Sequence, residues 1–177
     1  MLPKRRVWAA AACLLGKLYV MGGNVGRGDE AGFDKYSASC ICYDPSRPSD
    51  GWRRVADLRA GRANHAAAVL GGRLFVLGGR GEAGVLASVE RYDPEADAWE
   101  AVAPMDAIRF SHAAAVLDGK LFAVGGYGFN GDDIGGVRSC IRYDPAADVW
   151  EPAPDMVIGR SSPGVAVLDG KPWVAGG

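Results

Sequence analysis

The stretch Lys17-Leu18-Tyr19-Val20-Met21-Gly22-Gly23 decides the fold, because three further copies of it follow in the chain. Each copy consists of a basic residue, a short and mostly apolar run, and two glycines. The other copies occupy residues 73–79, 120–126 and 171–177. Their first glycines stand at positions 22, 78, 125 and 176, so the period is about 50 residues. Strand-like units that repeat at this period predict a propeller or another array of β repeats.

Composition excludes several classes of protein. The chain has 177 residues, 49% of them hydrophobic, and a net charge of −1, which predicts a globular protein with a sizeable core. The absence of a basic excess predicts that neither nucleic acid nor a membrane surface is a partner. The longest apolar run, residues 7–15, is much shorter than the roughly 20 residues that span a bilayer. The basic residues before it faintly resemble a signal peptide, but the run recurs before each later copy, so we interpret it as part of the repeat.

The four cysteines are Cys13, Cys40, Cys42 and Cys140, and no two have Cys-x-x-Cys spacing. This predicts no zinc or redox motif, and no metal or other cofactor is expected. Alignment of the repeats predicts that Cys13, Cys40 and Cys140 are small buried apolar residues in a reducing compartment, which favours the cytoplasm. Cys42 aligns with arginines and is expected to face solvent.

Each repeat contains four segments that favour β structure. A strand of small residues and a tight turn, such as Asp118-Gly119, precede the diglycine strand. A third strand ends in Tyr-Asp-Pro, at residues 43–45, 92–94 and 143–145, and a short fourth strand carries Trp52, Trp99 or Trp150. The pattern predicts four-stranded antiparallel meanders. Small residues on every first strand favour the blades of a propeller, because innermost strands crowd around a central axis.

The diglycine, the Tyr-Asp-Pro turn and the following tryptophan resemble the signature of kelch repeats, which build β-propellers. The resemblance covers the whole chain, 1–177, and implies an all-β, incomplete kelch propeller. We expect blades at about 6–56, 62–103 and 109–153 and a half blade at 160–177. Since kelch propellers are usually closed rings of five to seven blades, we interpret the chain as part of a larger propeller. The alternative is a free-standing fragment with exposed apolar flanks.

One end of the blades carries loops of variable length, at residues 24–36, 80–87 and 127–137, and this predicts a binding face. Four arginines occupy one equivalent position on that face. They could form an arc that binds carboxylates or phosphates, and kelch-type substrate receptors do line an acidic-peptide pocket with arginines from this loop. Alternatively, each arginine binds loop carbonyls or neighbouring acids. The four are Arg6, Arg62, Arg109 and Arg160.

Other candidate contacts lie close to these arginines in the sequence. Two residues after the first three come Trp8, Asn64 and Ser111, which are expected at the top of the channel wall. Trp8 could anchor a partner or pack against a neighbouring blade. Phe110 and Tyr127 could add apolar contacts near Arg109.

The repeat also places His65 and His112 at equivalent positions, and we expect them to be hydrogen-bonded structural residues. No catalytic residue is predicted, because no triad or paired-carboxylate motif is present. Some kelch propellers are copper oxidases or sugar-acid epimerases, but the Tyr-Cys-His set of the oxidases has no counterpart here.

The sequence therefore favours a protein-interaction module that binds a short acidic peptide segment on its variable-loop face. The resemblance further suggests the substrate-recognition part of a cullin-type ubiquitin ligase adaptor. Two alternatives remain open: an enzyme acting on a sugar or small molecule at the channel mouth, and a cytoskeletal scaffold.

Overall fold

The computed structural model describes residues 5–25, 35–128 and 136–177, and its principal elements form three four-stranded sheets and a two-stranded hairpin. All pairs of neighbouring strands are antiparallel. The first sheet contains β2 (Ala10–Leu14), β3 (Lys17–Met21), β6 (Cys40–Tyr43) and β7 (Trp52–Val55). The second contains β8 (Ala66–Leu70), β9 (Arg73–Leu77), β12 (Val89–Asp93) and β13 (Ala98–Val102). The third contains β14 (Ala113–Leu117), β15 (Lys120–Val124), β16 (Cys140–Asp144) and β17 (Val149–Ala153), and the hairpin is β18 (Gly164–Leu168) with β19 (Lys171–Ala175).

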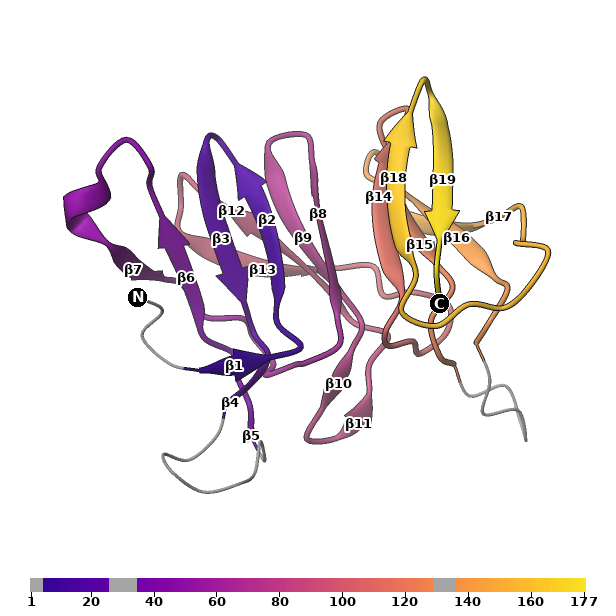
Figure 1. The fold of residues 1–177 in the computed structure, drawn as a ribbon, viewed down its shortest axis with the longest axis horizontal. Coiled ribbons are helices and arrows are strands. Elements are labelled where there is room, and N and C mark those ends of the chain that lie inside the picture. The colour runs from indigo at the N-terminus through magenta and orange to yellow at the C-terminus, as the bar shows by residue number, and fades with distance from the viewer. Residues whose placement is uncertain (1–4, 26–34, 129–135) are drawn as a thin grey trace.

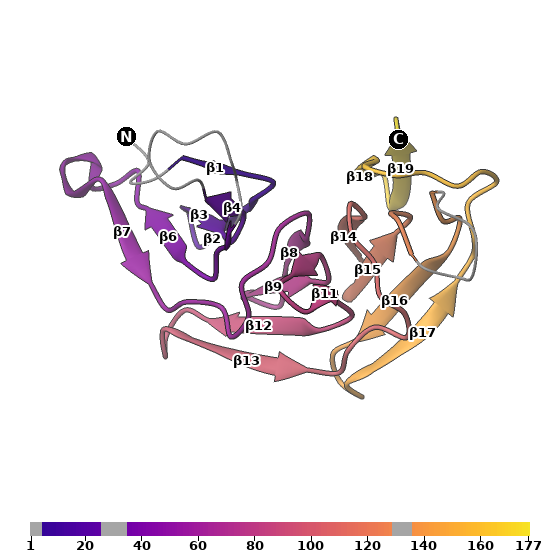
Figure 2. The same cartoon turned by 90° about the horizontal axis from the view of Figure 1, so that it is seen from below.

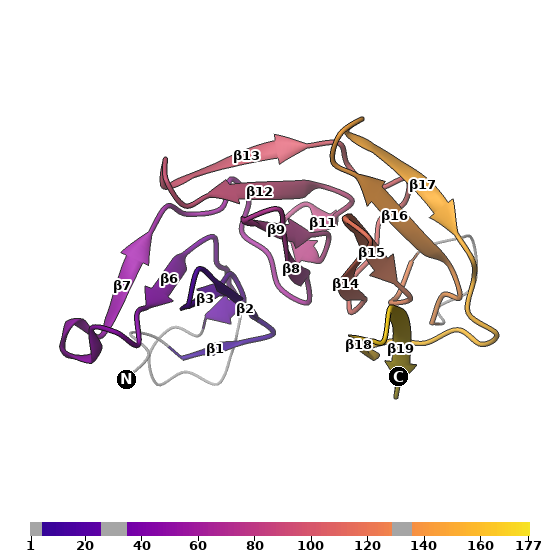
Figure 3. The same cartoon turned by 90° about the horizontal axis from the view of Figure 1, so that it is seen from above.

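The sheets fan out as blades around a common axis, and their first strands lie innermost (Figures 2 and 3). Strands β2, β8, β14 and β18 are neighbours in that order, while β7, β13 and β17 lie at the outer rim. The predicted all-β fold of incomplete propeller blades is therefore confirmed. Alanine and glycine predominate on the inner strands because side chains from neighbouring blades converge there.

Short elements gather at one end of the blades (Figure 1). Strand β1 (Arg6–Val7) pairs with β4 (Asn24–Val25), which also pairs with β5 (Lys35–Tyr36). Strands β10 (Arg80–Gly81) and β11 (Gly84–Val85) form a hairpin at the same end. A 3-10 helix, η1 (Pro48–Asp50), precedes β7. We call this end the loop face, because the tight turns between first and second strands lie at the other end.

Apolar side chains fill the two spaces between complete blades. One cluster joins the first and second blades and contains Tyr19 and Tyr92, whose ring centroids lie 5.8 Å apart. The other joins the second and third blades, where Phe75 and Tyr143 lie 5.9 Å apart. The second-strand aromatic of one blade thus meets the third-strand tyrosine of the next, and burial of these rings stabilises the joint.

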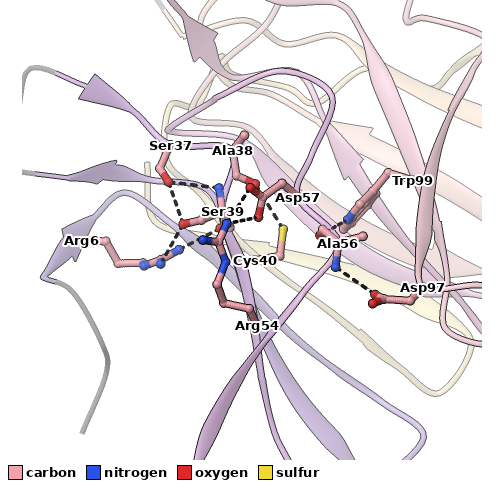
Figure 4. A network of polar contacts seen from close by, with 10 residues as sticks. All are labelled: Arg6, Ser37, Ala38, Ser39, Cys40, Arg54, Ala56, Asp57, Asp97 and Trp99. Carbon is pink, nitrogen blue, oxygen red and sulfur yellow. Dashed lines mark hydrogen bonds and ion pairs between the residues drawn. The ribbon is translucent and has the colours of Figure 1, made fainter.

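The outer edges of the blades are joined by polar contacts (Figure 4). Trp99 Nε1 donates to Ala56 O at 3.0 Å, and Ala56 N donates to Asp97 Oδ1 at 2.9 Å. Asp97 also accepts the Tyr92 hydroxyl at 2.6 Å. The aspartate and the tryptophan therefore bind both polar groups of one main-chain residue in the preceding blade. The third blade repeats this joint with Asp148, Trp150 and Ala103.

The diglycines allow neighbouring blades to approach closely. Gly78 has a φ of +54°, and a Cβ built on it would lie 2.5 Å from Arg109 O. Gly79 N donates to the same oxygen at 2.9 Å. A side chain at Gly78 would thus clash with the backbone of the next blade, which explains the glycine.

Two predictions about the cysteines are wrong. Cys42 is fully buried, because its strand position faces the second blade and packs in the cluster around Tyr19 and Tyr92. The arginines that align with it reach outward to glutamates instead. Cys13 is exposed, because it lies on the flank of the first blade that no described blade covers. Cys40 and Cys140 are buried as predicted, and burial raises the pKa of the Cys40 thiol to about 12.

Within the described residues, no helix has the length and apolar character needed to cross a bilayer.

Candidate functional site on the loop face

Arg62 is a structural clamp inside the second blade. Its guanidinium has no exposed surface and donates to Gly78 O at 3.0 Å, to Ser88 O at 3.1 Å and to Ser88 Oγ at 3.1 Å. It also forms a 2.6 Å ion pair with Glu90, a buried carboxylate on the third strand. Burial lowers the pKa of Arg62, while the Glu90 charge opposes that effect. The side chain ties the end of the second strand to the start of the third.

The equivalent arginines of the first and third blades make the same contacts without a carboxylate. Arg6 donates to Gly22 O at 2.9 Å, to Ser39 O at 3.0 Å and to Ser39 Oγ at 3.1 Å (Figure 4). Arg109 donates to Ser139 O at 3.3 Å and to Ser139 Oγ at 3.2 Å. Strand β16 has an isoleucine where the second blade has Glu90, and the described acceptors of Arg109 are all neutral oxygens.

The prediction of an arc of ligand-binding guanidiniums is therefore wrong for its two middle members, Arg62 and Arg109. Arg62 and Arg109 have exposed fractions of 0% and 2%, so a ligand on the loop face cannot reach them. Their side chains turn into their own blades, and the alternative interpretation, binding to loop carbonyls, applies. Arg6 is partly buried in the same clamp, and Arg160 is partly exposed with a bond to Gly176 O.

The residues two positions after the arginines form an arc around the axis. Trp8, Asn64, Ser111 and Ser162 have φ values of 55°, 53°, 52° and 53°, in the left-handed region. Each of the last three donates its backbone N–H to the carbonyl of its equivalent in the preceding blade, at 3.0, 2.8 and 2.7 Å. This chain of hydrogen bonds links four blades. A left-handed tryptophan is unusual, and the contact between Trp8 O and Asn64 N supports it.

A hollow of about 260 Å³ opens inside this arc. Trp8 stands beside it with 57% of its surface exposed, and the Asn64 and Ser111 side chains contribute neutral polar groups. The predicted position of these three at the channel mouth thus agrees with the geometry. The lining residues are Trp8, Ala9, Asn64, His65, Ser111, His112, Ser162 and Pro163.

His65 and His112 line the base of the hollow but are buried against the diglycines of the preceding blades. Burial lowers the pKa of each to about 3, so both rings are neutral at neutral pH. Neither ring nitrogen of His112 has a hydrogen-bond partner among the described residues, so the predicted hydrogen bond is absent there. Within residues 5–25, 35–128 and 136–177, no cluster of three or more His, Cys, Asp or Glu side chains could hold a metal ion.

A partly exposed stack of side chains lies on the loop face beside the third blade. Phe110 and Tyr127 stack with centroids 5.1 Å apart and an interplanar angle of 24°. The exposed Arg80 places its guanidinium carbon 5.0 Å from the centre of the Phe110 ring. We call these three residues the Arg80 stack. Phe110 and Tyr127 were predicted site residues and do come together, as an isolated β-bridge also shows.

Arg80 is not among the residues predicted for the site. A signal was available, because Arg80 and Tyr127 both follow a diglycine directly and are therefore equivalent. The position after each arginine clamp pairs with the position after the diglycine in the same blade. The Arg80 backbone keeps that pairing with Ala63, but the Arg80 side chain reaches across to Phe110 of the next blade. The middles of the first and third variable loops, residues 26–34 and 129–135, lie outside the described residues.

Comparison with known proteins agrees with this architecture. A family model of the Kelch motif matches residues 5–59, 61–106 and 108–157. The chain is 42% identical over 88 residues to Kelch-like protein 26 of Mus musculus, covering 49% of this chain and 14% of that protein. It is 29% identical over 188 residues to alpha-scruin of Limulus polyphemus, covering 99% of this chain and 19% of that protein. The chain thus spans less than a fifth of the length of these two relatives.

Among solved structures, that of YjhT superposes with a TM-score of 0.77 at 19% sequence identity. The match covers 98% of this chain and 58% of the YjhT chain, and it supports the fold alone.

Proposed function

Because the chain belongs to the kelch-repeat family, we propose that it is a protein-interaction module that binds a segment of a partner protein on the loop face. The observation that supports this proposal is the Arg80 stack, in which the exposed Arg80 lies over two partly exposed rings. Arginine, tyrosine and tryptophan dominate the energetically important positions of protein interfaces. A rigid propeller holds such side chains without the entropic cost of ordering a flexible loop.

The charge of Arg80 favours an acidic partner segment. Within the described residues, the exposed Arg80 guanidinium forms no ion pair with a carboxylate, whereas Arg73 and Arg91 do. The face of the Phe110 ring orients the guanidinium and leaves its N–H groups available to a carboxylate. Arg80 therefore takes the role that the sequence had suggested for the buried arginine clamps.

The hollow supplies a second, uncharged part of the proposed surface. Trp8 offers an exposed ring beside it, and the amide of Asn64 and the hydroxyl of Ser111 can bond to the backbone of an extended segment. We propose that a partner places one side chain in the hollow while its acidic residues contact Arg80.

A more specific role is the selection of substrates for a cullin-type ubiquitin ligase. This proposal rests on the similarity to Kelch-like proteins, and recruitment of a ligase would require a segment outside residues 1–177. The scaffold alternative rests on the similarity to scruin. No observation in the described residues favours a sugar-converting enzyme over these.

The proposal can be tested with an array of 15-residue peptides of graded acidity, probed with the full chain. We expect acidic peptides to bind and their signal to weaken with salt, since charge pairs at a surface are screened. Arg80→Gln and Phe110→Ala should each reduce that signal. Arg54→Gln is the matched control, because Arg54 is an exposed arginine on the outer strand of the first blade. If Arg80→Gln and Phe110→Ala bind like the parent, the Arg80 stack is not the recognition surface.

A further inference from the structure

We propose that Asn64 and Ser111 give the loop face its sequence specificity, by binding a carboxamide side chain two residues from the acidic residue that Arg80 binds. This specificity depends on the proposed function, the recognition of an acidic segment on the loop face. Asn64 and Ser111 each have a described blade on both sides, as the backbone hydrogen bonds of the arc show.

The Asn64 amide and the Ser111 hydroxyl take no part in holding the fold. Both side chains are partly exposed at the hollow, and neither forms a hydrogen bond with a described residue. Their backbones do hold the fold, because each N–H donates to a carbonyl of the preceding blade, at 3.0 and 2.8 Å. The rigid arc thus fixes both side chains in place and leaves their polar groups available to a ligand.

The backbone conformation at these two positions favours glycine. Asn64 and Ser111 have φ values of 53° and 52°, a region that asparagine tolerates and in which serine is strained. Elsewhere in the joints between blades, the fold meets this conformation with glycine, as at Gly78, or with an aspartate whose carboxylate accepts hydrogen bonds, as at Asp97. The Ser111 side chain carries the strain without an internal contact, so a contact outside the fold best explains its presence.

The lining of the hollow favours an uncharged group that both donates and accepts hydrogen bonds. None of its lining residues is charged at neutral pH, since burial lowers the pKa of His65 and His112 to about 3. The Asn64 amide and the Ser111 hydroxyl each offer a donor and an acceptor. A carboxamide satisfies both, whereas a carboxylate cannot donate and an apolar side chain leaves both groups unpaired.

The spacing follows from the contacts between these residues and the Arg80 stack. Ala63, which precedes Asn64, pairs with Arg80 through backbone hydrogen bonds of 2.9 and 2.8 Å. Phe110, which precedes Ser111, lies 5.0 Å from the Arg80 guanidinium carbon. In an extended segment, side chains two residues apart point to the same side and lie about 7 Å apart. A segment with its acidic residue on Arg80 therefore places the side chain two residues away at Asn64 and Ser111.

The test is an array of 15-residue peptides, each with a central glutamate in a background of glycine and alanine, probed with the full chain. Each residue type except cysteine is placed in turn two positions before or two positions after the glutamate. We expect glutamine and asparagine, at one of these positions, to bind about tenfold more tightly than glutamate, lysine or leucine, the effect of two hydrogen bonds. Arg80→Gln should weaken binding of every peptide in the array.

Glycine substitutions separate recognition from a structural role. The double variant Asn64→Gly with Ser111→Gly keeps the left-handed backbone and removes both polar groups. It should lose the preference for carboxamides, retain binding to the central glutamate and unfold at the same temperature as the parent. Asp118→Gly is the matched control, because Asp118 has a φ of 50° and is exposed in a turn at the other end of the blades. It should keep the preference.

Three results would overturn the assignment of Asn64 and Ser111. They are the absence of a carboxamide preference, a preference that survives in the double variant, and a lower unfolding temperature of that variant. Binding of glutamate peptides through Arg80 can persist in each case, so failure of this specificity is distinguishable from failure of the loop-face proposal. If no glutamate peptide binds, both are wrong.

Discussion

Replacing Glu90 by alanine should destabilise the chain strongly, and replacing it by isoleucine should cost clearly less. Glu90 accepts from Arg62 at 2.6 Å and from the backbone N–H groups of Arg59 and Ala60 at 2.7 and 3.3 Å. It thus balances a buried charge and holds the segment that leads into the second blade. The third blade has Ile141 at this position and still buries its arginine.

The two losses of unfolding free energy differ because alanine leaves the site unfilled, whereas isoleucine fills it with an apolar side chain. Removing one member of a buried ion pair typically costs about 3–5 kcal/mol, and Glu90→Ala additionally leaves two backbone donors without their acceptor. Isoleucine loses the same bonds but buries an apolar side chain, which returns about 1.5–2 kcal/mol. We therefore expect a loss of about 3–5 kcal/mol for Glu90→Ala and of roughly 1–3.5 kcal/mol for Glu90→Ile.

The measurement is equilibrium urea unfolding of the full chain at pH 7, followed by tryptophan fluorescence. Ile141→Ala is the control for apolar burial at the equivalent site. A loss below about 1 kcal/mol for Glu90→Ala would refute the account of a buried, charge-balanced clamp. Equal losses for alanine and isoleucine would show that an isoleucine at position 90 is not stabilising in the way that Ile141 is in the third blade.

Three further changes test the joints between blades. Because folding lowers the pKa of both His65 and His112 from 6.5 to about 3, acidification between these values should lower the unfolding free energy, each histidine contributing up to about 1.4 kcal/mol per pH unit. His112→Asn should therefore reduce the slope of that part of the profile without removing it. Gly78→Ala should lower the unfolding free energy by about 3 kcal/mol, because overpacking adds to the strain of a left-handed backbone. Gly71 has a φ of +56° but open space around it, so Gly71→Ala should cost only about 1 kcal/mol. Urea unfolding measures both losses. Asp148→Gly keeps the left-handed conformation but removes the acceptor of the Tyr143 hydroxyl and one backbone N–H, so thermal unfolding should show a loss of about 2 kcal/mol.

The fold was predictable because its physical requirements recur in every blade. Gly78 must be glycine wherever the next blade approaches within contact distance, so the diglycines mark the period. The turn aspartates and the rim tryptophans recur for the same reason, since each serves the same joint. Repetition of a joint leaves a repeated residue in the sequence, and alignment recovers it.

The direction of a side chain was not predictable from the same alignment. Arg62 and Cys42 were both assigned to accessible positions, yet Arg62 is buried in its own blade and Cys42 is buried between two blades. The backbone after Arg62 turns into the left-handed region at Asn64, and this local geometry is not encoded in spacing alone. Glu90 was missed because a glutamate on an apolar strand has no equivalent in the other blades, and only contacts reveal its partner.

These outcomes separate two kinds of residue in a repeat protein. The arginine clamps recur in every blade because every blade needs its second and third strands tied together, and that need explains their burial. Arg80 and Trp8 are exposed, Phe110 and Tyr127 are partly exposed, and none of the four has an equivalent of the same type in the other blades. Packing between blades does not explain why such residues occur in one blade only, whereas recognition of one particular partner does. Departure from the repeat is insufficient by itself, as the buried Glu90 shows, but departure combined with exposure on the loop face favours binding.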